Sequence, residues 1–370
     1  MRIKHQESEG LRGWMAKHVF LLILIPCSIL ILASGVTSAL ILIDMIEEPV
    51  AEEPEPEPDP DPEPIVKYFS HLTGLEVENK EALNRPATCV MIENAPEARP
   101  QSGVRNAGIV YEAIAEGGIT RFMTVYQEGE LPDLIGPVRS VRLYYAQWAK
   151  IYQCGIAHWG GADDALNLIR YTAGFRDADQ FFNPSAYWRL AGRAAPHNGY
   201  TNAERQKALN ASRGFGASEF VGFPRAIAGK LPTRSEVKAT TISMKISSAL
   251  FSVNYAYDAV SNSYLRAHDS GGAHMDRDVS DVRTQNAPKV VIAMMVGEVA
   301  RGGGPYINAV AIDTGVAHIF QNGEYIAGSW TKSSVDTELE FHDGAGKPIV
   351  FIPGQIWISA VPKTKAVSWQ

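Results

Sequence analysis

The stretch IVYEAIAEGGITRFMTVYQ, residues 109–127, decides the fold of the central part of this chain. Apolar and polar residues alternate on both sides of Gly117-Gly118, and alternation with a period of two is typical of β-strands. Two adjacent glycines accept the positive φ angles of a tight turn. The stretch therefore predicts a β-hairpin with three cross-strand pairs on one face of the sheet: Glu116–Ile119, Ile114–Arg121 and Glu112–Met123.

In this register, Arg121 lies diagonally between the carboxylates of Glu112 and Glu116. These carboxylates could orient the guanidinium towards a ligand, or one of them could act as a general acid or base. The alternative is an ordinary cross-strand ion pair on a solvated face of the sheet.

The segment LIGPVRSVRLYYAQWAK has a proline that suits the first position of a helix. We expect a helix over about 137–151 that carries Arg139 and Arg142 on one side. Cations in a first turn oppose the helix dipole, so a bound anion would make this arrangement more favourable. The alternative is that both arginines reach solvent or pair with carboxylates such as Glu112 and Glu116.

Two histidines lie where they could belong to a site. His158 ends an apolar run, and two glycines then lead to Asp163 and Asp164, which suit the first turn of a helix. The carboxyl end of a strand before a glycine-rich turn commonly displays reactive groups, so His158 is the best candidate for a titrating residue. His197 and Asn198 lie in the polar loop PHNGYT, where a surface histidine is the simpler interpretation.

The last third of the chain consists mainly of short β-branched and aromatic runs with hairpin signals such as Asn322-Gly323. It predicts a mainly antiparallel β region. The motif RAHDSGGAHMD places His268, His274 and Asp276 at a spacing compatible with metal ligation, although a solvated loop is the simpler interpretation.

Only Cys89 and Cys154 lie in the globular part, each in an apolar run. Outside the cell they could form a disulfide, and buried free thiols are equally ordinary. No C-x-x-C or H-E-x-x-H spacing is present, so we predict neither a metal site nor a cofactor.

Residues 19–43 contain no charged side chain and are long enough to cross a hydrocarbon core of about 30 Å as a helix. Because basic residues precede this run and acidic residues follow it, we expect residues 1–18 in the cytoplasm and the globular part on the extracytoplasmic side of the plasma membrane. A cleaved signal peptide is the alternative, but its apolar run would be unusually long. Cys27 is similar to a lipid-attachment cysteine, yet the apolar run continues past it. Residues 44–64, rich in proline and glutamate, predict an extended linker.

Charge in the globular part is almost balanced. Nine of the 41 acidic residues lie between residues 47 and 64 and three more, Glu7, Glu9 and Asp44, precede them, which leaves 29 acidic residues against 30 Lys and Arg beyond residue 64. Nucleic-acid binding is therefore not predicted, since it needs a strongly basic face.

The 306 residues after residue 64 are more than one hydrophobic core usually organises, so we expect two domains. The predicted fold class is α+β. A mixed α/β domain is expected at 65–225, a connection at 226–241, and a smaller, mainly antiparallel β domain at 242–370.

Several motifs together resemble the YerB-like family of bacterial cell-surface proteins. They are RPATCVMIENAPEARPQSGVRNAGIVYEAIAEGGITRF, IGPVRSVR, the PHNGYT loop, NGEYIAGSWTK and GQIWI, and the likeness covers roughly residues 66–362. The resemblance implies a two-part extracytoplasmic protein and names no reaction. Family members look lipoprotein-like at the start, whereas this chain has a plain apolar helix and an acidic linker. The resemblance carries over the following positions as site candidates: Arg99, Pro100, Gln101, Ser102, Glu112, Glu116, Arg121, Arg139, Arg142, His197 and Asn198.

The leading hypothesis is a membrane-anchored protein that binds an anionic component of the cell envelope. The ligand would be a glycan or a phosphate-bearing polymer, held by Arg121, Arg139 and Arg142 in a cleft of the first domain.

Two other hypotheses assign different functions. An envelope hydrolase would cleave glycosidic or phosphodiester bonds, with Glu112 or Glu116 as general acid or base and His158 or His197 moving a proton. A non-catalytic scaffold would organise other envelope proteins. The sequence names no protein partner.

Overall fold

The computed structural model describes residues 11–46, 66–227, 229–301 and 307–370. Helix α1, Leu11–Ile46, belongs to one unit, and residues 66–370 form a second, compact unit. Within α1, the segment Ile25–Leu42 has a mean hydropathy of 2.1 and is long enough to cross a membrane. The predicted apolar helix is therefore present, and residues 47–64 of the predicted linker lie outside the described residues.

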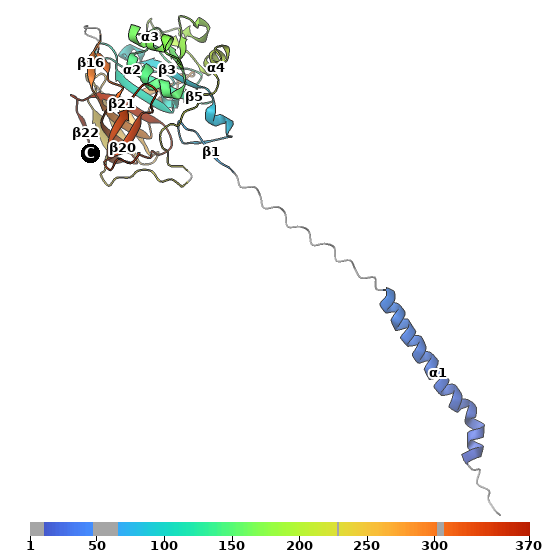
Figure 1. Ribbon diagram of the computed structural model, residues 1–370. Coiled ribbons are helices and arrows are strands. Elements are labelled where there is room, and N and C mark those ends of the chain that lie inside the picture. The colour runs from blue at the N-terminus through green and yellow to red at the C-terminus, as the bar shows by residue number, and fades with distance from the viewer. Residues whose placement is uncertain (1–10, 47–65, 228, 302–306) are drawn as a thin grey trace, which may run out of the picture. The chain divides into compact units, whose positions relative to one another are not determined.

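A ten-stranded sheet forms the centre of the second unit (Figure 1). Its strand order is β20-β19-β18-β15-β21-β4-β5-β3-β6-β7. Five strands come from the first predicted domain: β3 Ala87–Glu93, β4 Ile109–Ile114, β5 Thr120–Gln127, β6 Gly155–His158 and β7 Arg176–Asp179. Five come from the second: β15 Val290–Val296, β18 Asp313–Gln321, β19 Glu324–Lys332, β20 Glu340–Asp343 and β21 Ile356–Pro362. Because β21 pairs in parallel with both β15 and β4, the two predicted domains share one sheet.

A second sheet of four strands has the order β12-β11-β10-β22. Its strands are β10 Thr241–Met244, β11 Val253–Asp258, β12 Ser263–His268 and β22 Val367–Trp369. Short pairs of strands lie outside the two sheets: β1 Tyr68–Phe69 with β2 Glu76–Val77, β8 Trp188–Arg189 with β9 Gly199–Tyr200, β13 Met275–Arg277 with β14 Arg283–Gln285, and β16 Glu298–Ala300 with β17 Ile307–Ala309. The helices are α2 Leu143–Ala149, α3 Asp163–Tyr171 and α4 Ala203–Ser212, and they lie near β3 and β5 (Figure 1). The predicted α+β class is confirmed.

The large sheet has a buried core on each face. One face packs against α2 and α3 through residues such as Met91, Tyr111 and Trp148. The other face packs against loops and α4 in the first part of the chain and against the four-stranded sheet in the second part. Successive residues along one strand point to opposite faces of the sheet and therefore belong to different cores.

The predicted hairpin is β4–β5, but its predicted register is wrong by one residue. Glu112 pairs with Phe122, and Ala113 pairs with Arg121. The reason is that Glu116 belongs to the turn, since the N–H of Ala115 donates to the carbonyl of Ile119 and three residues are left between them. A one-residue shift moves a side chain to the opposite face of the sheet. Glu112 and Arg121 therefore point to opposite faces.

The predicted helix over 137–151 starts later than expected. Residues 137–142 are extended, and α2 begins at Leu143 with Arg142 as its N-cap. Backbone hydrogen bonds hold the extended segment, because the N–H of Arg139 donates to Met91 and the N–H of Trp159 donates to Arg139. These partners are remote in sequence, so the local pattern does not contain them. The helix-dipole argument for Arg139 does not apply.

Cys89 and Cys154 form a disulfide, which resolves the two alternatives left open by the sequence. Cys89 lies in β3 and Cys154 directly precedes β6, the parallel neighbour of β3. The bond closes a loop over a sequence separation of 65 residues. Cys27 in α1 is free and exposed.

Candidate functional site

Four of the predicted site residues gather at one end of the large sheet. We call the group formed by Glu93, Glu116, Arg121, Arg139 and Arg142 the arginine–carboxylate cluster. Glu93 ends β3, Arg121 is its cross-strand partner in β5, and Glu116 lies in the hairpin turn. Arg139 and Arg142 come from the extended segment before α2.

Within this cluster, each arginine contacts a carboxylate. Arg139 pairs with Glu93 through Nε, and Arg142 pairs with Glu116 through Nε and Nη2. Arg121 Nη2 lies 3.2 Å from Glu116 Oε2 and 3.9 Å from Glu93 Oε2. Arg121 is thus between two carboxylates as predicted, but Glu93 takes the place expected for Glu112.

Exposure differs strongly within the cluster. The side chains of Arg121 and Glu93 are almost fully buried, whereas those of Arg139 and Glu116 are 27% and 31% exposed. Arg142 is 11% exposed. The cluster therefore has a buried floor and a solvent-accessible side formed by Arg139 and Glu116.

The cluster holds three guanidinium groups and two carboxylates. Burial raises the pKa of the Glu93 carboxyl, but the charges of Arg121 and Arg139 outweigh burial and hold its pKa below the usual range. By formal charge these five side chains carry one excess positive charge, and the charges of Asp164 and Arg301 also act on Arg142. Arg121 Nε is buried without a hydrogen-bond partner, and the terminal nitrogens of Arg139 form no hydrogen bond with any described residue.

Glu112 lies on the opposite face of the sheet and is fully buried. Arg266 Nη2 lies 2.9 Å from both of its carboxylate oxygens. Three further donors complete its hydrogen bonding: Thr120 Oγ1, Trp357 Nε1 and Ser359 Oγ, each 3.1 Å away. Because five contacts from four side chains occupy this carboxylate, Glu112 has no free lone pair for a substrate.

A polar network extends from Arg266 into the first part of the chain. Arg266 Nη1 contacts His274 Nδ1, and His274 Nε2 donates to Gln101 Oε1 over 3.0 Å. Burial and the charge of Arg266 hold the pKa of His274 well below its usual range, so the ring is neutral. Gln101 Nε2 in turn donates to Asn94 Oδ1, which also accepts a hydrogen bond from Arg99 Nε. His274 is thus a buried connector rather than the solvated loop residue that the sequence suggested.

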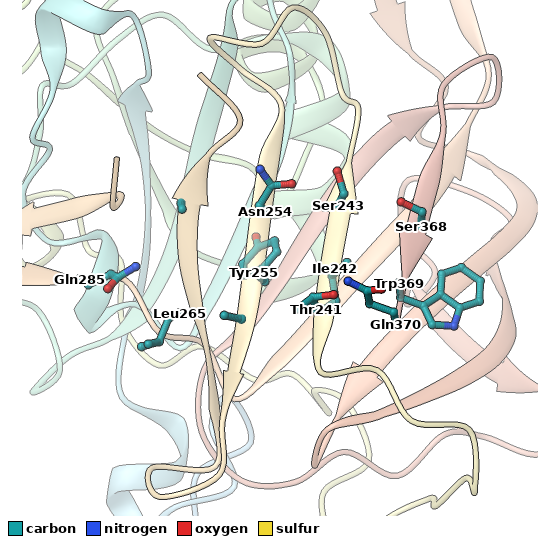
Figure 2. Close-up of a pocket in the computed structure, with 12 residues that line it drawn as sticks. Thr241, Ile242, Ser243, Asn254, Tyr255, Leu265, Gln285, Ser368, Trp369 and Gln370 are labelled. Carbon is teal, nitrogen blue, oxygen red and sulfur yellow. The ribbon is translucent and has the colours of Figure 1, made fainter. Parts of the chain in front are cut away.

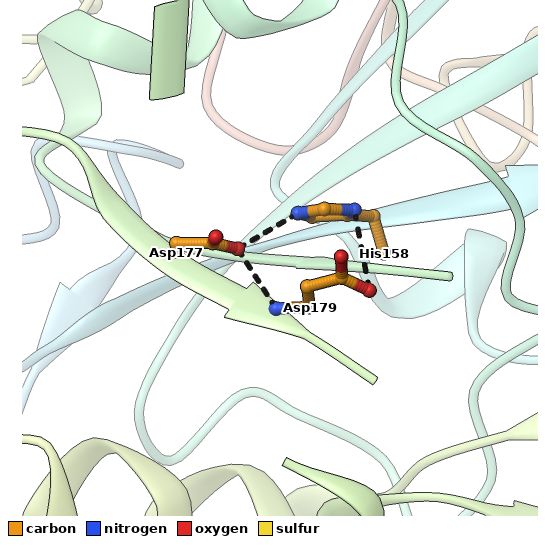
Figure 3. A group of neighbouring side chains, drawn as sticks. All are labelled: His158, Asp177 and Asp179. Atoms are coloured by element: carbon orange, nitrogen blue, oxygen red, sulfur yellow. Dashed lines mark hydrogen bonds and ion pairs between the residues drawn. The ribbon is translucent and has the colours of Figure 1, made fainter. Parts of the chain in front are cut away.

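His158 lies at the carboxyl end of β6, as predicted, and its side chain is fully buried (Figure 3). Nε2 lies 3.0 Å from Asp177 Oδ1, and Nδ1 lies 2.8 Å from the carbonyl oxygen of Gly160. Burial raises the pKa of Asp177, but the hydrogen bond and charge of His158 outweigh it and hold the pKa below its usual range. Asp179 lies beside them, with one possible ligand atom from each of the three residues within 4.8 Å of the others.

The spacing in this group would suit a metal ion, but its oxygens already have partners. Arg170 donates to Asp177 over 3.2 Å and to Asp179 over 2.7 Å. Both ring nitrogens of His158 face oxygen atoms. A cation would therefore have to displace Arg170, and we interpret the group as an ion-pair network that holds β6, β7 and α3 together.

Three loops that carry family motifs meet in the first domain, and they contain Ser102, Ile135–Gly136 and Thr201. Ser102 exchanges backbone hydrogen bonds with Gly136, and Ile135 does so with Thr201. Asn198 accepts from Arg189 over 2.6 Å, so its side chain binds within the protein. Ser102 Oγ and His197 Nδ1 are buried and have no partner among the described residues.

The structure thus divides the predicted site residues into separate groups. Glu116, Arg121, Arg139 and Arg142 lie together, and Arg99, Gln101 and Glu112 belong to the buried network on the other face. His158 belongs to a third group, whereas Ser102, His197 and Asn198 lie in the motif loops. Sequence reasoning missed Glu93 and Arg266 as partners, although a charged residue inside each strand pattern, CVMIE and SYLRAH, was the available signal.

Comparisons with known proteins show which family the chain resembles. Residues 72–216 match the family described as "Protein of unknown function (DUF3048) N-terminal domain", and residues 242–358 match its C-terminal domain. The chain is 30% identical over 298 residues to "Putative lipoprotein YerB" of Bacillus subtilis (strain 168), which covers 80% of this chain and 87% of that protein. The crystal structure of YerB protein from Bacillus subtilis matches with a TM-score of 0.69 and 25% identity, over 82% of this chain and all of that one.

Proposed function

The chain belongs to the YerB-like family and matches both DUF3048 domains, and from this premise we propose that it is a membrane-anchored extracytoplasmic protein that binds an anionic component of the cell envelope. The arginine–carboxylate cluster is the proposed binding site. The ligand would bear phosphate or carboxylate groups, because a planar guanidinium pairs with either of them through two parallel hydrogen bonds.

Three observations support the proposed location. The segment Ile25–Leu42 is apolar enough to cross a membrane, and basic residues precede it in the sequence. The Cys89–Cys154 disulfide is typical of an oxidising compartment outside the cytoplasm. The relative from Bacillus subtilis carries the name "Putative lipoprotein YerB".

The observation that carries the proposed binding is the charge excess of the cluster. A partly buried guanidinium without a full set of acceptors loses hydration that the protein does not replace. Arg121 Nε is in this position, since it is buried and has no hydrogen-bond partner in the part of the chain that the structure describes. The terminal nitrogens of Arg139 belong to a side chain that is 27% exposed, and they form no hydrogen bond with any described residue. An anion beside Arg139 would supply the missing acceptors and balance the uncompensated charge.

The same geometry favours binding over acid–base catalysis. Glu112 is fully buried, and four side chains already occupy its two oxygens. Glu116 lies between Arg121 and Arg142, and each of its two oxygens already contacts a guanidinium group.

The test replaces both accessible arginines by glutamine, because Arg139→Gln and Arg142→Gln keep hydrogen-bonding groups next to Glu93 and Glu116. The full chain in lipid nanodiscs is mixed with purified cell walls, either intact or stripped of phosphate polymers by acid. We expect the double variant to lose at least tenfold in retention on intact walls. The matched control is Arg213→Gln, an exposed arginine beside Phe215 in the turn after α4.

The two wall preparations identify the source of the anion. If the wild type is no longer retained after stripping, the ligand is a phosphate polymer. If it is still retained on stripped walls, the ligand is a carboxylate of the peptidoglycan. Equal retention of the wild type and a folded double variant on both preparations would contradict the proposal.

A further inference from the structure

The outer face of the four-stranded sheet contains a groove of about 720 Å³ (Figure 2). Ile242 and Tyr255 point away from it into the core, so the strands themselves are fixed by buried side chains. The groove is thus formed by the alternate, outward-facing residues of a rigid sheet. Its volume lies within the range of roughly 300–1,000 Å³ that is usual for small-molecule sites.

Two rows of short side chains form the floor of the groove. Strand register places Ala267, Asn254, Ser243 and Ser368 in one row across the four strands. The next row consists of Leu265, Ala256, Thr241 and the C-terminal residue Gln370. Figure 2 shows the side chains of Asn254, Ser243 and Ser368 beside one another across the sheet.

None of the twelve residues that line the groove has a charged side chain, although charged residues make up 20% of the chain. A solvated sheet face usually carries long charged side chains, and here the floor has hydroxyl, amide and methyl groups instead. Lys245, which directly follows β10, is already paired with Asp269 over 2.7 Å. An anionic ligand would therefore find no cation in the groove.

We propose that this groove binds a neutral oligosaccharide. A sugar ring has an apolar C–H face and an edge of hydroxyl groups, and it needs apolar surface next to groups that both donate and accept hydrogen bonds. Ala256 and Leu265 supply the apolar surface, and Ser243, Asn254 and Thr241 supply hydroxyl and amide groups within the same two rows. The short side chains lose little rotamer freedom when a ligand binds.

A peptide that adds a strand to this sheet is a less suitable ligand than an oligosaccharide at the edge formed by β12. The N–H groups of Arg266 and His268 in β12 already donate to Asn286 and Gly272. The β12 edge is therefore closed by the protein itself.

The test uses isothermal titration calorimetry of the full chain in nanodiscs with two neutral tetrasaccharides, chitotetraose and cellotetraose. The variant Ala256→Asp places a charged, larger group on the groove floor, at an exposed position that tolerates it. We expect the wild type to bind at least one tetrasaccharide and the variant to bind it at least tenfold more weakly. The matched control is Ala327→Asp, an exposed alanine in β19, which should bind as the wild type does.

Three results would overturn this inference: no binding of either tetrasaccharide, equal affinities of wild type and Ala256→Asp, or a wild-type dimer that Ala256→Asp separates in sedimentation. The last result would assign the groove to contacts between copies of the chain. Variants of Arg139 and Arg142 should keep tetrasaccharide binding, so failure of the anion site and failure of the groove are separate outcomes.

Discussion

Replacing Glu116 by glutamine separates the binding and catalytic interpretations of the arginine–carboxylate cluster. Glu116 occupies Arg142 and Arg121, so it competes with any incoming anion for these guanidinium groups. In the variant, three cations face only the carboxylate of Glu93. We expect Glu116→Gln to bind a phosphate-bearing ligand more tightly than the wild type.

The size of the gain follows from the charge removed. For an assumed separation of roughly 6 Å between a bound anion and the Glu116 carboxylate, two unit charges repel by about 0.7 kcal/mol in water and about 3 kcal/mol at an effective dielectric constant of 20. Glu116 is 31% exposed, so a value near 1 kcal/mol is appropriate, which is about fivefold in affinity. Loss of its ion pairs costs the fold about 1 kcal/mol, so the variant remains folded.

Calorimetric titration with glycerol phosphate, at 20 mM and 150 mM salt, measures the gain. The matched control is Glu128→Gln, because Glu128 also forms a partly exposed ion pair, with Lys207 at 3.4 Å, and lies just beyond the opposite end of β5. The control should leave the affinity unchanged. Higher salt should reduce the difference between Glu116→Gln and the wild type.

Weaker or unchanged binding by Glu116→Gln would refute this reasoning. If purified cell-wall glycan were instead cleaved by the wild type and not by Glu116→Gln, the glutamate would be an acid–base catalyst and the hydrolase hypothesis would replace the binding one.

Three further predictions concern stability, each measured by urea unfolding of the unit 66–370. Loss of the disulfide through Cys89→Ala and Cys154→Ala should lower the free energy of unfolding by about 4 kcal/mol, since the bond closes a long loop; no loss would show that the unfolded chain is already constrained. Glu112→Gln should cost about 3–5 kcal/mol because it leaves the buried Arg266 without its counter-ion, whereas a cost below 1 kcal/mol would mean that Glu112 is not structural. Burial raises the pKa of Asp276 to about 7. Between pH 7 and pH 5 the folded state therefore binds a proton that the unfolded state does not bind. As a result, this group stabilises the fold by about 2 kcal/mol more at pH 5 than at pH 7. When the pH is lowered from 7 to 5, the free energy of unfolding of Asp276→Asn should therefore fall by about 2 kcal/mol relative to that of the wild type. Parallel pH profiles of the two free energies would contradict the raised pKa.

The local sequence pattern was sufficient to predict several elements. Gly117 and Gly118 both have positive φ, as the predicted hairpin turn requires, and the Asn322-Gly323 turn joins β18 to β19. The strand that ends at His158 is also confirmed. In each case the determining residues are adjacent in the chain, so their preferences are visible in the sequence.

The errors arose where distant segments determine the structure. The turn at Glu116 has one more residue than the glycine pair suggests, and that single residue moved Glu112 to the other face of the sheet. The extended conformation of residues 137–142 depends on backbone partners in β3 and at Trp159. Arg266 meets Glu112 across a sequence separation of 154 residues, a contact that no local pattern contains.

The candidate site contains the predicted arginines but a different carboxylate, Glu93, in place of Glu112. Arg121, Arg139 and Arg142 were predicted as a group from their residue type and their place in the family motifs, and the structure brings them together. Their partner Glu93 could not be identified, because the pairing of β3 with β5 decides which carboxylate lies beside Arg121. Residue type therefore identified the cations, and sheet register selected their counter-ions.

The most direct test of the central claim is a crystal structure of the protein with glycerol phosphate. We expect a phosphate group at the arginine–carboxylate cluster, with oxygen atoms about 3 Å from the terminal nitrogens of Arg139. A structure in which the protein holds the phosphate elsewhere, with Arg139 and Arg142 still paired only with Glu93 and Glu116, would contradict it.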